Sequence, residues 1–233
     1  MKARLLSWKE LAPEVRHFEF DLPDREELHF TPGQFVSVLQ AINGKEITRA
    51  YSIASPRDGN RFALCLNRVQ EGLVSNYLFR LQPGDEVEMH EPLGYFTLRH
   101  AGRRAVFIAT GTGIAPFRSM LLDHLPKLRP QVTLLFGVRY EYGLLYRGEL
   151  EELAGAYPSF RFVPTVTRPE TSWTGRTGRV QQHVDEVLAL HTPDEIFNVD
   201  VYICGLKEMV DDVRRELKQR GFDRKQIIYE KYD

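Results

Sequence analysis

Two glycines separated by one residue follow a continuous apolar run in the second half of the chain. The run, residues 105–110, is typical of a strand buried on both faces of a parallel sheet, and apolar residues recur at helical spacing after Gly113. A strand, a glycine turn and a helix in this order present backbone N–H groups and the positive end of a helix dipole to an anion. The turn from Gly111 to Gly113 therefore predicts a nucleotide pyrophosphate site, although any tight turn between a strand and a helix also favours glycine.

This turn departs from the G-x-G-x-x-G fingerprint of dinucleotide-binding folds, because Pro116 occupies the position of the third glycine. The acidic residue that would bind a ribose hydroxyl about 20 residues further on is also missing. The next strand-like run leads instead to Arg139, and a cation at this place suits a ribose that carries a 2′-phosphate. The turn therefore indicates a nucleotide-binding family other than the standard Rossmann proteins.

A second group of reactive or ligand-binding side chains lies in the first half of the chain. Arg49, Tyr51 and Ser52 place a cation, an aromatic ring and a hydroxyl on one extended segment. In a regular strand Arg49 and Tyr51 point to one face and Ser52 to the other. Taken alone, the segment is more typical of a barrel strand with an exposed arginine and a packed tyrosine than of a binding site.

The elements that must position these groups change character along the chain. Residues 1–98 contain short runs of alternating polarity, separated by turn signals such as Pro32-Gly33 and Pro83-Gly84. Many short strands with few helices predict a small antiparallel barrel. We expect strands within residues 15–22, 34–39, 61–66 and 86–89, and one short helix that begins near Ser75.

After the basic segment 99–104, strand-like runs alternate with segments of helical spacing. This alternation predicts a parallel sheet with helices on both faces. We therefore expect an N-terminal antiparallel β-barrel domain, residues 1–99, and a doubly wound α/β domain, residues 100–233. The expected strands of the second domain are 105–110, 131–136, 160–166, 199–203 and 226–229, and its expected helices are 114–125, 148–155, 180–190 and 206–220.

The 233 residues have an ordinary globular composition, with 42% hydrophobic and 27% charged residues. The formal net charge of −1 gives no basic footprint of a nucleic-acid-binding protein. No apolar run approaches the ~18 residues of a membrane span. Cys65 and Cys204 cannot supply the four thiolates of an ordinary iron–sulfur cluster and suggest no disulfide framework. We expect a protein of the reducing cytoplasm, with no metal site.

Four motifs follow one another along the chain. They are Arg49-Ala50-Tyr51-Ser52, Gly72-Leu73-Val74-Ser75, Gly111-Thr112-Gly113-Ile114-Ala115-Pro116 and Cys204-Gly205-Leu206-Lys207-Glu208-Met209. In this order and spacing they resemble the ferredoxin–NADP(+) reductase family. The similarity extends over nearly the whole chain, including residues 32–35 and the terminal Glu230-Lys231-Tyr232.

The resemblance implies that the first domain binds FAD. Arg49 would contact a flavin phosphate, Tyr51 would lie against the isoalloxazine ring, and the Ser52 hydroxyl would approach the flavin N5. Residues 72–75 would hold the FAD pyrophosphate, which favours FAD over FMN because FMN has only one phosphate. Plant members have a longer loop here with a tyrosine that stacks on the adenine, whereas residues 68–71 lead straight into Gly72. The residues that the resemblance assigns to FAD are Arg49, Ala50, Tyr51, Ser52, Leu66, Asn67, Gly72, Leu73, Val74, Ser75 and Tyr232.

The resemblance also implies that the second domain binds NADP(H), with NAD(H) as the less favoured alternative. Thr112 and Gly113 would meet the nucleotide pyrophosphate. Three arginines match places where relatives contact the adenosine end, and Arg179 stands where some relatives have an adenine-stacking tyrosine. The residues assigned to this nucleotide are Thr112, Gly113, Arg139, Thr167, Arg168, Arg176, Gly205, Leu206 and Met209.

The same resemblance places the hydride-transfer site at Ser52, Cys204 and Glu230. Cys204 would face the nicotinamide, and Tyr232 would cover the face of the flavin where the nicotinamide must sit. Without the motif that follows it, Cys204 would be interpreted as a buried small hydrophobic residue.

The implied activity is hydride transfer between NADP(H) and FAD, and one-electron exchange with ferredoxin or flavodoxin. One alternative is an NADH-dependent reductase that serves an oxygenase or another acceptor. A second alternative is a flavin-bearing subunit or redox-sensing module with little turnover of its own. A monomer without nucleic-acid or membrane partners is expected in each case.

Overall fold

The computed structural model describes residues 1–42, 44–127, 131–190 and 198–232. These residues form two compact units. The first unit comprises Met1–Thr97 and Ala115–Asp123, and the second comprises the rest of the described chain. No helix among the described residues is long and apolar enough to cross a membrane.

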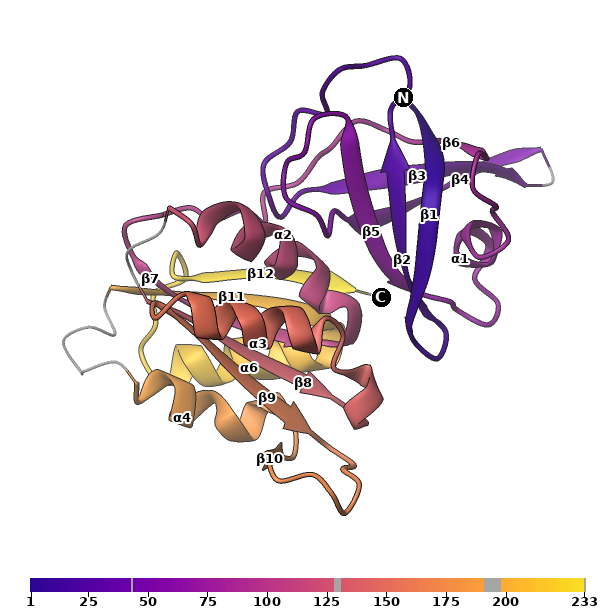
Figure 1. Ribbon diagram of the computed structural model, residues 1–233. Coiled ribbons are helices and arrows are strands. Elements are labelled where there is room, and N and C mark those ends of the chain that lie inside the picture. Colours follow the sequence, from indigo (N-terminus) through magenta and orange to yellow (C-terminus); the bar gives the residue numbers. More distant parts are fainter. Residues whose placement is uncertain (43, 128–130, 191–197, 233) are drawn as a thin grey trace. The chain divides into compact units, whose positions relative to one another are not determined.

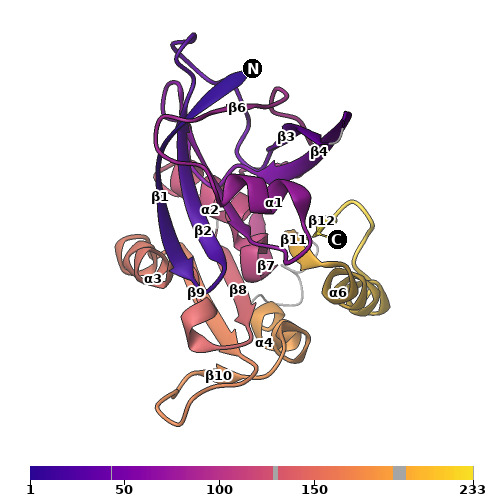
Figure 2. The same ribbon diagram turned by 90° about the vertical axis from the view of Figure 1, so that its right-hand side faces the viewer.

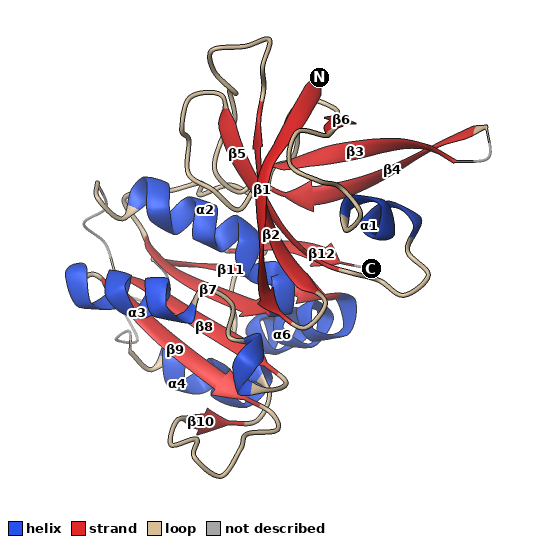
Figure 3. Ribbon diagram, turned by 45° about the vertical axis from the view of Figure 1, so that its right-hand side comes forward, coloured by secondary structure: helices blue, strands red, loops and turns tan. Residues whose placement is uncertain are grey.

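The first unit is built on a curled antiparallel sheet with the strand order β5-β2-β1-β6. A hairpin of β3 and β4 joins this sheet through isolated bridges between Val38 and Met89 and between Ile53 and Leu64. Figure 3 shows the long, twisted strands β1 and β2 of this sheet. This half-barrel confirms the predicted antiparallel β fold. Its strands are β1 (Lys2–Ala12), β2 (Val15–Asp21), β3 (Phe35–Ile42), β4 (Lys45–Ser52), β5 (Arg61–Asn67) and β6 (Glu86–Glu88).

Alternating side chains of these strands form the core of the half-barrel. Phe18 and Phe20 of β2 are fully buried, while Glu19 between them is exposed. The ring of Phe20 stacks on Phe62 of β5 with centroids 5.5 Å apart. The short helix α1 (Leu73–Leu78) begins two residues before the predicted Ser75 and buries Val74 and Leu78 against this core.

Most of helix α2 (Ile114–His124) belongs to the first unit, because its residues Ala115–Asp123 make their contacts there. Arg118 donates a hydrogen bond to the carbonyl oxygen of Ala54 at 2.7 Å, and the Ser119 hydroxyl donates to that of Ser55 at 2.6 Å. Arg57 forms a bidentate ion pair with Asp123, with both distances 2.9 Å. The predicted division at residues 99 and 100 assigns this helix to the second domain, whereas these contacts attach it to the segment that follows β4.

The second unit contains a six-stranded parallel sheet with the order β10-β9-β8-β7-β11-β12. The central strand β7 pairs with β8 on one side and β11 on the other, as Figure 1 shows. This arrangement confirms the predicted α/β fold. The strands are β7 (Arg104–Thr110), β8 (Val132–Val138), β9 (Phe160–Val166), β10 (Arg176–Thr177), β11 (Val199–Leu206) and β12 (Ile227–Tyr232).

Helices cover both faces of this sheet. α4 (Val184–Leu188) and α6 (Lys207–Gln219) share one apolar cluster with side chains of β7 and β11. Figure 2 shows α3 (Arg147–Ala156) on the opposite side of the sheet from these two helices. The predicted helix over 180–190 is divided into a 3₁₀ turn, η3 (Val180–His183), and α4. The two-residue strand β10 was not expected, because it is too short to have a hydrophobic period.

Candidate functional site

Strand β4 carries the side chains predicted to meet the flavin. Tyr51 is half-buried against the core of the half-barrel, and this burial raises the pKa of its hydroxyl to about 12, although the nearby Arg49 opposes the shift. Arg49 is exposed, and its guanidinium donates to the carbonyl oxygen of Thr48 at 2.8 Å. Ser52 is buried and pairs with Phe35 of β3. The strand thus offers an accessible cation beside a half-buried ring and a buried hydroxyl.

The second predicted FAD segment is a tight loop that runs into α1. The Ser75 hydroxyl accepts a hydrogen bond from the Val69 amide at 3.1 Å and donates to the Gly72 carbonyl at 3.3 Å. A Cβ atom at Gly72 would lie 2.6 Å from the Ser75 Oγ, so a side chain does not fit there. No described side chain caps the N-terminus of α1, and its first N–H groups are therefore available to an anion. Of the neighbouring predicted residues, Leu66 and Val74 are buried, and Asn67 and Leu73 are exposed.

The glycine turn after β7 is the 3₁₀ turn η1 (Gly111–Gly113). A Cβ atom at Gly113 would overlap the carbonyl oxygen of Cys204, and one at Gly205 would overlap the Thr110 hydroxyl. The turn therefore lies directly against the carboxyl end of β11. The Thr110 Oγ1 is buried and has no hydrogen-bond partner among the described residues. Thr110 was not among the residues predicted from the sequence, although a hydroxyl directly before a glycine turn is a recognisable signal.

The carboxyl ends of β11 and β12 bring together Cys204, Glu230 and Tyr232. Cys204 pairs in register with Glu230, and a hydrogen bond joins the side chains of Cys204 and Tyr232. Burial raises the pKa of the Cys204 thiol well above its usual value, the Glu230 carboxylate raises it further, and the Tyr232 hydrogen bond opposes both. The thiol is consequently neutral at physiological pH. Ser52, the other residue predicted for hydride transfer, belongs to the first unit.

Two of the predicted nucleotide arginines lie on adjacent segments at the carboxyl edge of the sheet. The Thr167 amide donates to the Val138 carbonyl at 2.9 Å, and the Arg168 amide donates to the Arg139 carbonyl at 2.8 Å. These bonds continue the pairing of β8 and β9 beyond their ends. The side chains of Arg139 and Arg168 are both exposed. This edge is where parallel α/β sheets bind ligands.

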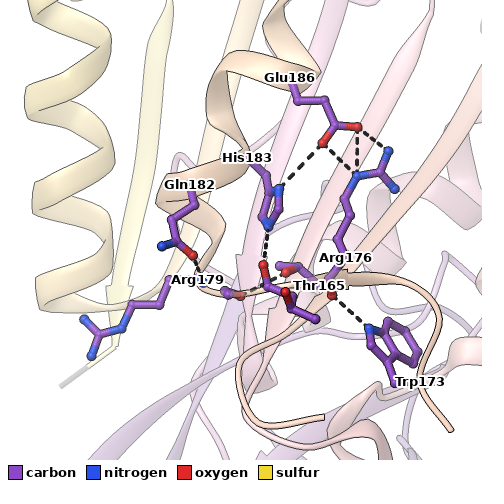
Figure 4. Close-up of polar contacts among 9 residues, drawn as sticks. Thr165, Trp173, Arg176, Arg179, Gln182, His183 and Glu186 are labelled. Carbon is purple, nitrogen blue, oxygen red and sulfur yellow. Dashed lines mark hydrogen bonds and ion pairs between the residues drawn. The ribbon is translucent and has the colours of Figure 1, made fainter. Parts of the chain in front are cut away.

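The third arginine, Arg176, is engaged within the protein. Its guanidinium forms a bidentate ion pair with Glu186, and the Arg176 Nε lies 2.8 Å from each carboxylate oxygen. This pairing lowers the pKa of Glu186. Figure 4 shows the ion pair and the side chain of Arg179, which extends away from it. Arg176 is therefore less accessible to a phosphate than Arg139 and Arg168.

Arg179 borders a surface pocket of about 470 Å³ in the second unit. The pocket lies between η3 and α6 and is lined only by polar side chains. At the start of α6, Leu206 is exposed and Met209 is buried. The lining residues are Arg179, Gln181, Gln182, Asp212, Arg215, Glu216 and Gln219.

The raised pKa of Cys204 predicts a loss of stability in alkali. Below about pH 8.5 the thiol is protonated in both the folded and the unfolded chain, so its contribution to stability is complete. Above that pH the unfolded thiol ionises first, and the free energy of unfolding falls by about 1.4 kcal/mol per pH unit. Cys204→Ser has no thiol to ionise at this position. Above pH ~8.5 its free energy of unfolding should therefore fall less steeply than that of the wild type, by about 1.4 kcal/mol per pH unit.

Urea unfolding at pH 8, 9 and 10 measures both slopes. Tyr51 and Tyr202, whose pKa values burial raises to about 12, contribute equally in the wild type and the variant. Parallel slopes for the two proteins would contradict the assignment of the alkaline loss to Cys204.

Comparison with known proteins gives matches along nearly the whole chain. Residues 2–98 match the oxidoreductase FAD-binding domain, and residues 107–215 match the oxidoreductase NAD-binding domain. The ferredoxin–NADP reductase B of Sorangium cellulosum is 41% identical over 240 residues, which cover 100% of this chain and 97% of that protein. The toluate 1,2-dioxygenase electron transfer component of Pseudomonas putida is 31% identical, over 88% of this chain and 60% of that protein.

A solved structure supports the same assignment. The ferredoxin NADP+ reductase from Neisseria gonorrhoeae, with bound FAD and NADP, has a TM-score of 0.86 and 26% identity to this chain. The match covers 99% of this chain and 98% of that one. On the two domain matches and the 41% identity along its full length, this chain belongs to the ferredoxin–NADP(+) reductase family of flavoprotein oxidoreductases.

Proposed function

We propose that the protein is an FAD-dependent enzyme that exchanges a hydride with NADP(H) and single electrons with ferredoxin or flavodoxin. The observation that carries this proposal is the cluster of Cys204, Glu230 and Tyr232 beside the η1 turn. It joins a neutral thiol, an acid and an aromatic ring at the ligand-binding edge of the sheet. The relative from Sorangium cellulosum, which is named a ferredoxin–NADP reductase, supports the same activity.

The first unit has the donors that FAD requires. The exposed guanidinium of Arg49 suits a phosphate, because a planar cation can donate two parallel hydrogen bonds. The ring of Tyr51 would lie against the isoalloxazine, and the Ser52 hydroxyl would approach N5. The uncapped N–H groups at the start of α1 would receive the pyrophosphate.

The second unit has a matching set of groups for the pyridine nucleotide. Thr112 and Gly113 would bind the pyrophosphate with their backbone amides. The buried Thr110 hydroxyl has no hydrogen-bond partner among the described residues, and a polar group of the nucleotide would satisfy it. Arg139 and Arg168 would bind the 2′-phosphate that distinguishes NADP from NAD. Arg179 and its pocket would accept the adenosine end.

When bound, FAD supplies the redox chemistry, because it accepts a hydride and passes electrons on singly. The protein residues would position the nicotinamide and the flavin and would cover the reactive face of the flavin. The neutral thiol of Cys204 would pack against the nicotinamide without adding a charge. The ring of Tyr232, held by its hydrogen bond to Cys204, would cover the reactive face until the nucleotide replaces it. Glu230 would hold or release a proton beside them.

A second candidate function is an NADH-dependent reductase component for an oxygenase. Two observations favour it: Arg176 is already paired with Glu186, which removes one cation from the 2′-phosphate site, and one relative is a dioxygenase electron transfer component. The two functions differ in nucleotide preference and in the protein that accepts electrons.

Purified, flavin-loaded enzyme distinguishes these functions. We expect heat-released cofactor to be FAD by chromatography, dye reduction to be faster with NADPH than with NADH, and added ferredoxin or flavodoxin to be reduced at saturable rates. Release of FMN alone would refute the cofactor assignment. Preference for NADH would support the oxygenase component, and slow reduction of every acceptor would indicate a module with little turnover.

The arginines at the carboxyl edge predict nucleotide selectivity. A charge-assisted hydrogen bond contributes roughly 1.5–3 kcal/mol, and about 1.4 kcal/mol corresponds to tenfold in affinity. Arg168→Ala should therefore weaken NADPH binding roughly tenfold to a hundredfold and leave NADH binding unchanged. Arg176→Ala should have a smaller effect, because Glu186 already neutralises that guanidinium.

Titration of each variant with both nucleotides measures these effects. Arg161→Ala is the matched control. Arg161 is an exposed arginine at the start of β9, whereas Arg168 follows the end of the same strand. Equal weakening of NADPH and NADH by Arg168→Ala would rule out a 2′-phosphate contact.

The position of Tyr232 predicts competition between its ring and the nicotinamide. Aromatic stacking contributes about 0.5–1.5 kcal/mol beyond area burial, so the ring is a cover that a nucleotide can displace. Tyr232→Ser should bind NADP(+) more tightly, strengthen the charge-transfer absorbance between nicotinamide and flavin, and slow product release. Tyr232→Phe keeps the ring but loses the hydrogen bond to Cys204, and should bind NADP(+) like the wild type.

Flavin difference spectra recorded during NADP(+) titration test both variants. If Tyr232→Ser gives the wild-type affinity and spectrum, Tyr232 does not cover the flavin.

A further inference from the structure

One amide side chain organises the loop that precedes α1. The Asn76 Nδ2 donates to the carbonyl oxygens of Val69 at 2.9 Å, Gln70 at 3.2 Å and Gly72 at 2.8 Å. Its Oδ1 accepts a hydrogen bond from the Arg68 Nε at 2.7 Å. A single side chain therefore contacts the loop at four of its residues. The resemblance to known reductases assigned residues 72–75 to the cofactor but not Asn76.

The direction of these hydrogen bonds changes the electrostatic environment of the loop. Three carbonyl oxygens, each the negative end of a peptide dipole, face the Asn76 amide. Because these oxygens accept hydrogen bonds from the Asn76 amide, part of their negative charge is offset within the loop, which favours an anion at the proposed pyrophosphate site. The Ser75 hydroxyl adds to the same arrangement, because it donates to the Gly72 carbonyl. These hydrogen bonds lie within the loop and restrict its conformation, which lowers the entropy cost of ordering it when a ligand binds.

We propose that Asn76 is a positioning residue of this loop and determines the preference of the protein for FAD over FMN. This inference rests on the proposed function, in which the loop receives the FAD pyrophosphate. FMN has no pyrophosphate and would depend on Arg49, Tyr51 and Ser52 alone. Loss of the Asn76 contacts therefore affects the part of FAD that FMN lacks. Asn76 acts through the loop backbone and not by touching the reacting atoms.

The test measures FAD and FMN affinities of flavin-free protein by fluorescence quenching. Asn76→Asp is isosteric and keeps an acceptor for Arg68, but it replaces the donor amide with an oxygen that repels the three carbonyl groups. Asn76→Ala removes both kinds of contact. Each variant should bind FAD about tenfold or more weakly, the scale of one or two lost hydrogen bonds, and bind FMN within about twofold of the wild type.

Gln70→Ala is the matched control, since that side chain is exposed in the same loop and should leave both affinities unchanged. The inference is overturned if Asn76→Asp retains wild-type FAD affinity, or if FAD and FMN weaken equally, which would indicate a general loss of structure. The melting temperature of the flavin-free variants provides an independent measure of such a loss.

Gly72→Ala separates this inference from the proposed FAD site. A Cβ there would lie 2.6 Å from the Ser75 Oγ and 2.7 Å from the Val69 Cβ, so it must distort the loop. If Gly72→Ala leaves FAD binding intact, the loop is not the FAD site. If Gly72→Ala weakens FAD binding and both Asn76 variants do not, the site stands and the role of Asn76 is refuted.

Discussion

The contact between the η1 turn and the end of β11 is the constraint on which the candidate nucleotide site depends. Gly113 leaves no room for a side chain against the Cys204 carbonyl, and Gly205 leaves none against Thr110. Because these backbones touch, the turn, the thiol of Cys204 and the Thr110 hydroxyl share one small region. The parallel pairing of β11 with β12 then adds Glu230 and Tyr232. A larger residue at either glycine would separate groups that the proposed chemistry needs together.

At the start of helix α2 the chain passes from the second unit to the first. The preceding strand β7 belongs to the parallel sheet and the η1 turn to the same unit, whereas the helix from Ala115 onwards groups with the first unit. Gly33 makes this packing possible, since a Cβ there would overlap the Phe96 carbonyl oxygen and the end of Met120. Ser119 is fully buried, and its hydroxyl is satisfied because it donates to the carbonyl oxygen of Ser55. The hydrogen bonds of Arg118 and Ser119 and the space left at Gly33 therefore decide where this largely buried helix packs.

Most of the fold could be predicted from local patterns. The strand over 160–166 has the predicted bounds, and the parallel sheet follows from the alternation of strands and helices. The grouping of Cys204, Glu230 and Tyr232 was predicted only through resemblance, because no local pattern relates residues nearly 30 positions apart. The pair of Arg176 and Glu186 was missed for a similar reason, since it depends on where α4 packs. Asn76 gave no signal, because three of its partners are backbone carbonyls, which every sequence contains, and its side-chain partner Arg68 is eight positions away.

The neutral state of the Cys204 thiol also bears on chemical durability. Reduced flavins react with dioxygen to give peroxide, and peroxide attacks the thiolate form of cysteine. A fully buried thiol that keeps its proton in neutral solution reacts slowly, so the proposed position of Cys204 beside the flavin chemistry does not make it a sacrificial target. Cys65 is likewise buried. Both cysteines of the chain are therefore shielded from reactive oxygen species that a flavoenzyme generates during turnover.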